Sequence, residues 1–135
     1  MIQSKTQRQV VGTLGEDLAV KYLKNKGFSI IARNYRKKFG EVDIIAERKR
    51  RLHFVEVKTV SCENVKDFTP EAWDAFRPED NVHDWKLRRL SNVIQVYLSE
   101  DRVRGEHDWQ FDVITVLLDE KNKIAKVKFI QDIIL

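Results

Sequence analysis

Two short runs of alternating apolar and polar residues follow one another in the first half of the chain. They are Gly40–Glu47 and Leu52–Lys58, and both are rich in β-branched residues. Each run is therefore predicted to be a β-strand. The four basic residues Arg48–Arg51 stand between them and are predicted to form a hairpin loop of about four residues.

Helical periodicity appears on both sides of this hairpin. The first predicted helix starts at a capping box of Ser4 and Gln7 and ends near Asn25, with Gly27 as its left-handed cap. The second runs from Trp85 to Ser99, with Asp84 as its cap. Its expected apolar face consists of Leu87, Leu90, Ile94, Tyr97 and Leu98.

Small residues form a stripe along the first predicted helix. They are Gly12, Gly15 and Ala19. A glycine inside a helix costs about 1 kcal/mol relative to alanine. We therefore expect this stripe to lie close to another stretch of backbone.

Three further strands complete the predicted order α-β-β-β-α-β-β, and a turn over residues 36–40 joins the first of them to the hairpin. They are Phe28–Tyr35, Trp109–Leu118 and Ile124–Ile130. This order predicts an α/β fold with a mixed central sheet of about five strands flanked by helices.

Residues 61–84 form an irregular, acidic stretch that interrupts this order. A short helix is predicted over Pro70–Phe76, because Thr69 and Pro70 resemble a helix start. Trp73 and Phe76 are expected to belong to a minor core.

The composition of the 135 residues is that of a globular protein, with 42% hydrophobic and 34% charged residues. We expect a single domain over residues 1–135. No long apolar run or signal peptide is present, so we expect a cytoplasmic protein that does not enter a membrane. The single Cys62 agrees with this location and is expected to be an inert thiol.

Positive charge is concentrated in the half of the chain that carries the hairpin. Residues 1–60 hold 14 Lys and Arg against 6 Asp and Glu, whereas residues 61–135 hold 11 against 15. A basic surface of this kind favours a phosphodiester substrate, although a solvated basic surface is also common.

The hairpin register determines which charged residues meet. If the loop is centred between Lys49 and Arg50, Asp43 lies opposite Glu56, Glu41 opposite Lys58 and Ile45 opposite Phe54. Alternation then places all six side chains on one face. Two opposed carboxylates repel each other unless a cation lies between them, and Mg²⁺ (or Mn²⁺) commonly takes one or two carboxylates. The alternative is a solvated hairpin end with a Glu41–Lys58 pair.

Other candidate residues flank this pair of acids. Glu16 follows Gly15 and is either a further ligand for the cation or an ordinary solvated glutamate. Six basic residues are candidates for contact with a phosphate backbone, or are simply solvated: Arg36, Lys37, Lys38, Lys86, Arg88 and Arg89. The histidines His53, His83 and His107 are scattered and form no ligand set.

Several motifs taken together resemble the YraN-like family of small bacterial proteins. They are Gly12-x-x-Gly15-Glu16-x-x-Ala19-x-x-Tyr22-Leu23, then Asn34-Tyr35-Arg36 leading to Gly40-Glu41-Val42-Asp43-Ile44-Ile45, then Phe54-Val55-Glu56-Val57-Lys58-Thr59. Lys86-Leu87-Arg88-Arg89-Leu90 and Phe111-Asp112-Val113 also match. The resemblance covers nearly the whole chain except residues 61–80.

That family looks like a minimal PD-(D/E)XK nuclease, with a restriction-endonuclease-like core similar to that of archaeal Holliday-junction resolvases. By this resemblance Asp43 and Glu56 are the two motif carboxylates, Lys58 is the motif lysine, and Glu16 is the helix glutamate that completes the cation site. Glu41-Val42 stands where the motif has a proline before the aspartate, so the role of Glu41 is open.

The resemblance and the residues together favour a Mg²⁺-dependent endonuclease acting on branched or single-stranded DNA. Lys58 would orient the attacking water, and junction cutting would require a homodimer. The alternatives are a nucleic-acid-binding module without turnover and a scaffold whose residues 61–80 bind a protein partner.

Overall fold

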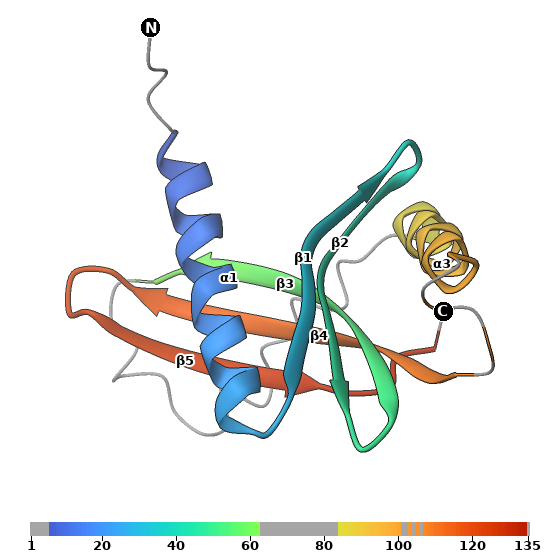
Figure 1. Ribbon diagram of the computed structural model, residues 1–135. Helices are drawn as coiled ribbons and strands as arrows, with labels where there is room; N and C mark the ends of the chain where they lie inside the picture. The colour runs from blue at the N-terminus through green and yellow to red at the C-terminus, as the bar shows by residue number, and fades with distance from the viewer. Residues whose placement is uncertain (1–5, 63–83, 101–102, 104, 106, 135) are drawn as a thin grey trace, which may run out of the picture.

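The computed structural model describes residues 6–62, 84–100, 103, 105 and 107–134. Within these ranges the predicted order α-β-β-β-α-β-β is confirmed (Figure 1). The elements are α1 (Gln7–Asn25), β1 (Ser29–Lys37), β2 (Gly40–Arg48), β3 (Arg51–Ser61), α3 (Asp84–Leu98), β4 (Asp108–Asp119) and β5 (Ile124–Ile130). The helix predicted at Pro70–Phe76, with Trp73 and Phe76, lies outside the described residues.

The predicted mixed sheet of five strands is also confirmed. Its strands lie in the order β1-β2-β3-β4-β5. β3 and β4 are parallel, and the other neighbours are antiparallel. Parallel neighbours need a long crossover connection, and α3 lies within it.

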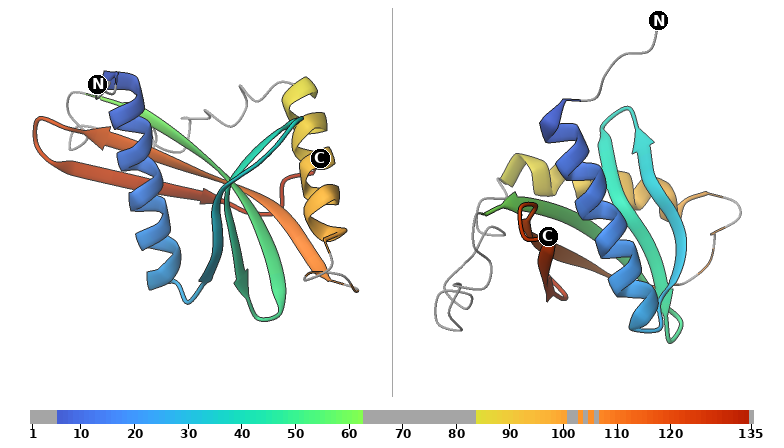
Figure 2. Two further views of the ribbon diagram at one scale, coloured as in Figure 1. Left: turned by 45° about the horizontal axis from the view of Figure 1, so that its top comes forward. Right: turned by 90° about the vertical axis from the view of Figure 1, so that its left-hand side faces the viewer.

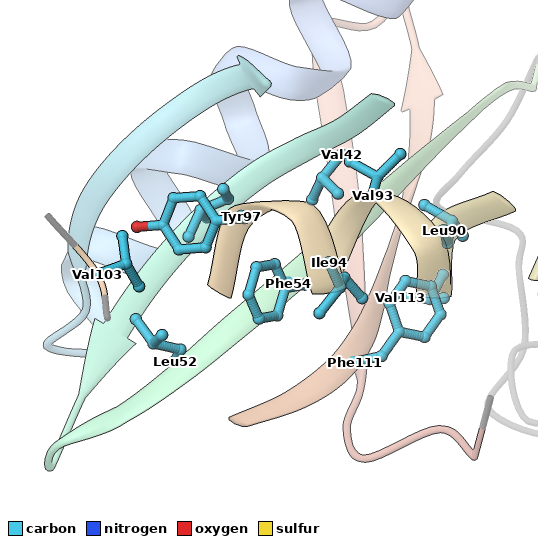
Figure 3. Packing of buried hydrophobic residues seen from close by; sticks show 11 residues of the cluster. Val42, Leu52, Phe54, Leu90, Val93, Ile94, Tyr97, Val103, Phe111 and Val113 are labelled. Atoms are coloured by element: carbon cyan, nitrogen blue, oxygen red, sulfur yellow. The ribbon is translucent and has the colours of Figure 1, made fainter. Parts of the chain in front are cut away.

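The two helices cover opposite faces of the sheet (Figures 1 and 2). On β3, Phe54 packs in the cluster that contains α3, whereas its neighbour Val55 packs in the cluster that contains α1. Adjacent strand residues point to opposite faces, so each helix has its own core. The core beneath α3 is shown in Figure 3 and includes Val42, Leu52, Phe54, Leu90, Val93, Ile94, Tyr97 and Phe111.

The start of α1 differs from its prediction, while its end agrees. Thr6 is the N-cap and forms the capping box with Gln9, so the box predicted for Ser4 and Gln7 is wrong. Both boxes satisfy the same sequence pattern, and only packing distinguishes them. At the other end, Gly27 has the predicted left-handed conformation, with φ of 90°.

The small residues of α1 play different roles. A Cβ added to Gly15 would lie 1.8 Å from Thr59 Oγ1, so this glycine lets α1 approach β3 as expected. A Cβ added to Gly12 would meet no atom within 4 Å. The prediction of close packing is therefore confirmed for Gly15 and wrong for Gly12.

The hairpin of β2 and β3 has the predicted register but a shorter turn. Cross-strand pairs run from Ile44–Val55 to Arg48–Arg51, and their numbers have the predicted sum. Only Lys49 and Arg50 form the turn, with φ of 51° and 64°. Two central residues with positive φ match the tight turn whose twist suits a hairpin, so the predicted loop of about four residues is wrong.

No helix in residues 6–62 and 84–134, as far as they are described, is long and apolar enough to cross a membrane.

Candidate functional site

A cavity of about 560 Å³ lies beside the N-terminal half of α1, where β2 and β3 separate. The recorded pairs of β2 and β3 start at Ile44–Val55, and beyond this point the β1–β2 hairpin bends away from β3 (Figure 1). Four acidic residues line the cavity: Glu16 from α1, Glu41 and Asp43 from β2, and Glu56 from β3.

The two central carboxylates meet here, but not on the flat face that simple alternation predicts. Ile45 and Phe54 pack in the core beneath α3, whereas Asp43 and Glu56 line the cavity beside α1. Val57, the next residue after Glu56, lines the same cavity. The acids therefore gather at the gap between two strands. Val55 and Val57 both pack in the core beneath α1, so Glu56 keeps the predicted alternation with Phe54. Val42 and Ile45 both pack in the core beneath α3, so alternation is interrupted on β2, and the predicted face-sharing of Asp43 with Ile45 is wrong.

Asp43 has the most perturbed environment in the cavity. Its side chain is buried, and its Oδ2 accepts a hydrogen bond of 2.8 Å from the Val57 backbone N–H. Burial, followed by the negative charge of Glu56, raises the pKa of Asp43 from 3.8 to about 8. The Val57 N–H opposes this rise, and the charges of Glu16 and Glu41 add to it.

The raised pKa means that Asp43 holds a proton at neutral pH when no cation is present. Glu56 is also buried, with 6% of its surface exposed. A buried carboxylate beside another carboxylate keeps its charge only when hydrogen-bond donors or an opposing charge stabilise it. Either a proton or a cation at this position would reduce the repulsion between the two acids.

The outer acids of the cavity are paired with arginines. Glu16 Oε2 lies 3.8 Å from Arg33 Nη2, which also bonds Asp17 at 2.8 Å. Glu41 accepts a bond of 2.7 Å from Arg36 Nε, its cross-strand neighbour on β1. The Glu41–Lys58 pair considered from the sequence is therefore replaced by a Glu41–Arg36 pair.

Lys58 is half-buried on β3, two residues after Glu56, and lies next to Thr115 of β4. It is not one of the residues that line the cavity. Its role as the motif lysine stays a prediction.

The basic residues expected to contact phosphate have different surroundings. Lys37 lies 3.6 Å from Glu100, while Lys38 is exposed in the β1–β2 turn. Arg89 Nε donates to the Phe39 carbonyl at 2.5 Å, so this arginine ties α3 to that turn. Arg88 is exposed, and the side chain of Lys86 lies outside the described part of the chain.

Asn34 was not identified from the sequence as a candidate, yet it lines the cavity. Its neighbours Arg33 and Tyr35 pair with Ile44 and Val42, which places Asn34 opposite Asp43. Asn34 has φ of 52°. Asparagine tolerates a positive φ better than most residues. An Asn inside a predicted strand was therefore the one sign in the sequence of an irregular backbone at this position.

The donor set fits a hard cation with few protein ligands. In the described part of the chain, no three His, Cys, Asp or Glu side chains form a ready metal-binding group. Mg²⁺ usually binds one or two carboxylates and keeps water and substrate oxygens as its other ligands. Asp43 and Glu56 supply such a pair, and Glu16 lies on the same cavity wall.

Comparison with known proteins gives consistent matches over most of the chain. The model of a family described as "Uncharacterised protein family UPF0102" matches residues 15–116. A UPF0102 protein of Alkaliphilus oremlandii is 45% identical over 114 residues, which cover 82% of this chain and 87% of the relative. One from Caldanaerobacter subterraneus is 33% identical over 93% of this chain and 95% of the relative, and one from Dictyoglomus turgidum is 31% identical over 89% and 92%.

Proposed function

The chain belongs to the uncharacterised protein family UPF0102, and from this premise we propose that it is a metal-dependent, endonuclease-like protein that hydrolyses phosphodiester bonds in DNA. The observation that carries the proposal is that Asp43 and Glu56 line the same cavity beside α1. Burial and the negative charge of Glu56 raise the pKa of Asp43 there to about 8. The resemblance to PD-(D/E)XK nucleases supports the same assignment.

Asp43 and Glu56, with Glu16, would hold Mg²⁺ (or Mn²⁺) in this cavity. The bound ion would activate water and stabilise negative charge on the phosphate. The chain's own residues prepare the site. The Val57 N–H fixes the Asp43 carboxylate, and Arg33 holds Glu16 at the cavity wall. By the resemblance to the nuclease motif, Lys58, two residues after Glu56 and outside the cavity lining, would reach the site to orient the attacking water and offset negative charge in the transition state.

DNA would approach from the exposed mouth of the cavity. Arg36 lines this cavity, and 74% of its side chain is exposed. Its guanidinium bonds Glu41 through Nε, which leaves its other N–H groups for a phosphate. Lys38 and Arg88 are exposed and would add contacts to the backbone.

The test is cleavage of branched and linear DNA in the presence of Mg²⁺ or Mn²⁺. We expect Asp43→Asn and Glu56→Gln to abolish product, and Lys58→Ala to slow cleavage about a hundredfold, as for loss of one preorganised electrostatic group. Glu47→Gln is the matched control, because Glu47 is an exposed acid on the same strand as Asp43.

Cleavage that survives both Asp43→Asn and Lys58→Ala would come from a contaminant or another site and would overturn the proposal. DNA binding that weakens steeply with salt, with no product under any condition, would instead favour a binding module without turnover. A pull-down of a protein partner that is lost on deletion of residues 61–80, with no DNA binding, would favour the scaffold.

A further inference from the structure

A second cavity lies at the tip of the β2–β3 hairpin, at the opposite end of the hairpin from the carboxylate cavity. Its volume is about 320 Å³. The residues that line it carry no acid: Arg48, Lys49, Arg51, His53, Gln110 and Gln131. It is therefore a basic and amide-lined cavity, opposite in charge to the first.

A buried histidine forms part of the wall of this cavity. His53 is 4% exposed, and its Nδ1 lies 2.6 Å from Oδ2 of Asp112, which is fully buried. Asp112 Oδ1 also accepts bonds from Gln110 Nε2 at 2.7 Å and from the Asp132 N–H at 2.9 Å. The carboxylate is thus fully engaged, and it holds the imidazole of His53 in one orientation.

The second ring nitrogen of His53 remains available to a ligand. Among the described residues, Nδ1 makes the only hydrogen bond of this side chain. In the described part of the chain, Nε2 is not one of the fully buried atoms without a hydrogen bond, so part of its surface is accessible, and His53 lines the cavity. A nearly buried polar atom without a hydrogen bond costs free energy, and a polar ligand that bonds it would remove this cost.

The two arginines that line the cavity are held by neighbouring groups, yet each keeps N–H groups that no described residue accepts. Arg48 stacks on Phe28 at 4.3 Å and donates one bond to the Lys26 carbonyl, while Arg51 donates one bond to Gln110. Each guanidinium has five N–H groups, so further donors remain. Within the described ranges, no carboxylate forms an ion pair with Arg48, Lys49 or Arg51.

We propose that this hairpin-tip cavity is a binding site for a phosphate group, held by Arg48, Lys49 and Arg51 and contacted by the buried His53. Guanidinium groups bind phosphate through paired N–H donors, and lysine adds a point charge. The phosphate comes either from a small molecule or from a nucleic-acid backbone, and both present the same chemistry to the site. The inference is independent of the proposed nuclease activity.

The experiment titrates the full chain with inorganic phosphate, a nucleoside 5′-monophosphate and a short single-stranded oligonucleotide, each at constant ionic strength set with chloride. The readout is the imidazole nitrogen and proton resonances of His53. We expect a saturable shift of these resonances with at least one ligand, and the tightest ligand identifies the source of the phosphate.

Two variants of the same turn provide the matched comparison. Lys49 lines the cavity and Arg50 does not, although both have positive φ and both carry one charge. We expect Lys49→Gln to weaken binding roughly tenfold, as for loss of a charged hydrogen bond, and Arg50→Gln to leave it unchanged.

Equal weakening by Lys49→Gln and Arg50→Gln would mean that net charge alone attracts the anion, and would overturn the site. Absence of a saturable His53 shift with all three ligands would do the same. Asp43→Asn must leave phosphate binding intact, so failure of the nuclease proposal and failure of this one are distinguishable.

Discussion

Asp43 differs from an exposed aspartate because of its surroundings alone. Its side chain is buried next to Glu56, and the Val57 backbone N–H donates a hydrogen bond to it. A single N–H does not offset the combined effect of burial and a neighbouring negative charge. The result is a pKa of about 8, which makes this residue sensitive to pH and to cations in the neutral range.

Replacing the ionisable side chain of Asp43 with a neutral amide is expected to stabilise the protein above pH 4. Below about pH 4 the folded and unfolded states both hold the proton. Between pH 4 and 8 the unfolded state loses it while the folded state keeps it, so wild-type stability falls as pH rises. Asp43→Asn has no such proton and keeps an acceptor for the Val57 N–H.

The measurement is urea unfolding of wild type and Asp43→Asn from pH 4 to pH 8.5 without divalent cations. We expect the variant's advantage in unfolding free energy to grow with pH by more than about 1.4 kcal/mol, the value of one pKa unit. Glu47→Gln serves as the control for a lost surface charge. A difference that stays constant with pH would contradict the raised pKa.

At the scale of elements, one glycine lets α1 lie close to β3. Gly15 is buried against Thr59 of β3, whereas Gly12 borders the open cavity. Because Glu16 follows Gly15, this close approach also sets the position of a cavity carboxylate. Glycine therefore allows close packing at position 15 and borders open space at position 12.

Alanine at these two glycines is expected to have opposite effects on stability. Gly12→Ala removes a helix-destabilising residue without a clash and should stabilise the fold by up to about 1 kcal/mol. Gly15→Ala puts a methyl group into Thr59 and should destabilise the fold by about 1–3 kcal/mol, as overpacking does. Thermal and urea unfolding of both variants would measure this.

Comparing Gly12→Ala with Gly15→Ala controls for helix propensity, because both variants make the same change in the same helix. Thr59→Ala, combined with Gly15→Ala, should recover part of the loss because it removes the hydroxyl and the methyl group of Thr59 that the new Cβ would meet. Equal stabilisation by both alanines would show that α1 does not depend on close approach at Gly15.

At the scale of the whole molecule, an acidic cavity and a basic cavity lie at opposite ends of the β2–β3 hairpin. The acid cavity lies where β2 leaves β3, and the basic cavity lies at the β2–β3 turn. The parallel pairing of β3 with β4 places Gln110 beside His53 in the wall of the second cavity, and it brings Asp112 within hydrogen-bond distance of His53. The two cavities can be perturbed one at a time.

Binding of a divalent cation is expected to stabilise the whole fold, because the ion would offset the repulsion between Asp43 and Glu56. At a Mn²⁺ concentration about a hundred times the dissociation constant, the gain is about 2.7 kcal/mol. The melting temperature should therefore rise by several degrees. Below pH 8 the cation competes with the Asp43 proton, so its affinity should fall as pH falls.

Differential scanning calorimetry at pH 6 and pH 8, with and without Mn²⁺, measures both effects. Asp43→Asn should abolish the shift, whereas Glu47→Gln should keep it. A Mn²⁺ effect of equal size in Asp43→Asn would place the ion elsewhere on the surface.

The residue pattern alone was sufficient for the helices and strands of the described residues, for their order and for the hairpin register, because these follow from local periodicity. Alternation over Gly40–Glu47 and Leu52–Lys58 specifies two strands, and the basic residues between them specify the centre of the turn. Asp43 and Glu56 were identified from this register, whereas Glu16 was identified from its place after Gly15 and from the family resemblance. All three line one cavity.

Only the tertiary structure decided the two-residue turn, the cap at Thr6, the role of Arg89 and the separate environments of Asp43 and Ile45. These depend on how distant segments pack, which periodicity does not encode. The pairing of His53 with Asp112 joins residues 59 positions apart, and it follows from the parallel alignment of β3 and β4. The raised pKa of Asp43 likewise comes from burial and neighbouring charge, which exist only once the chain has folded.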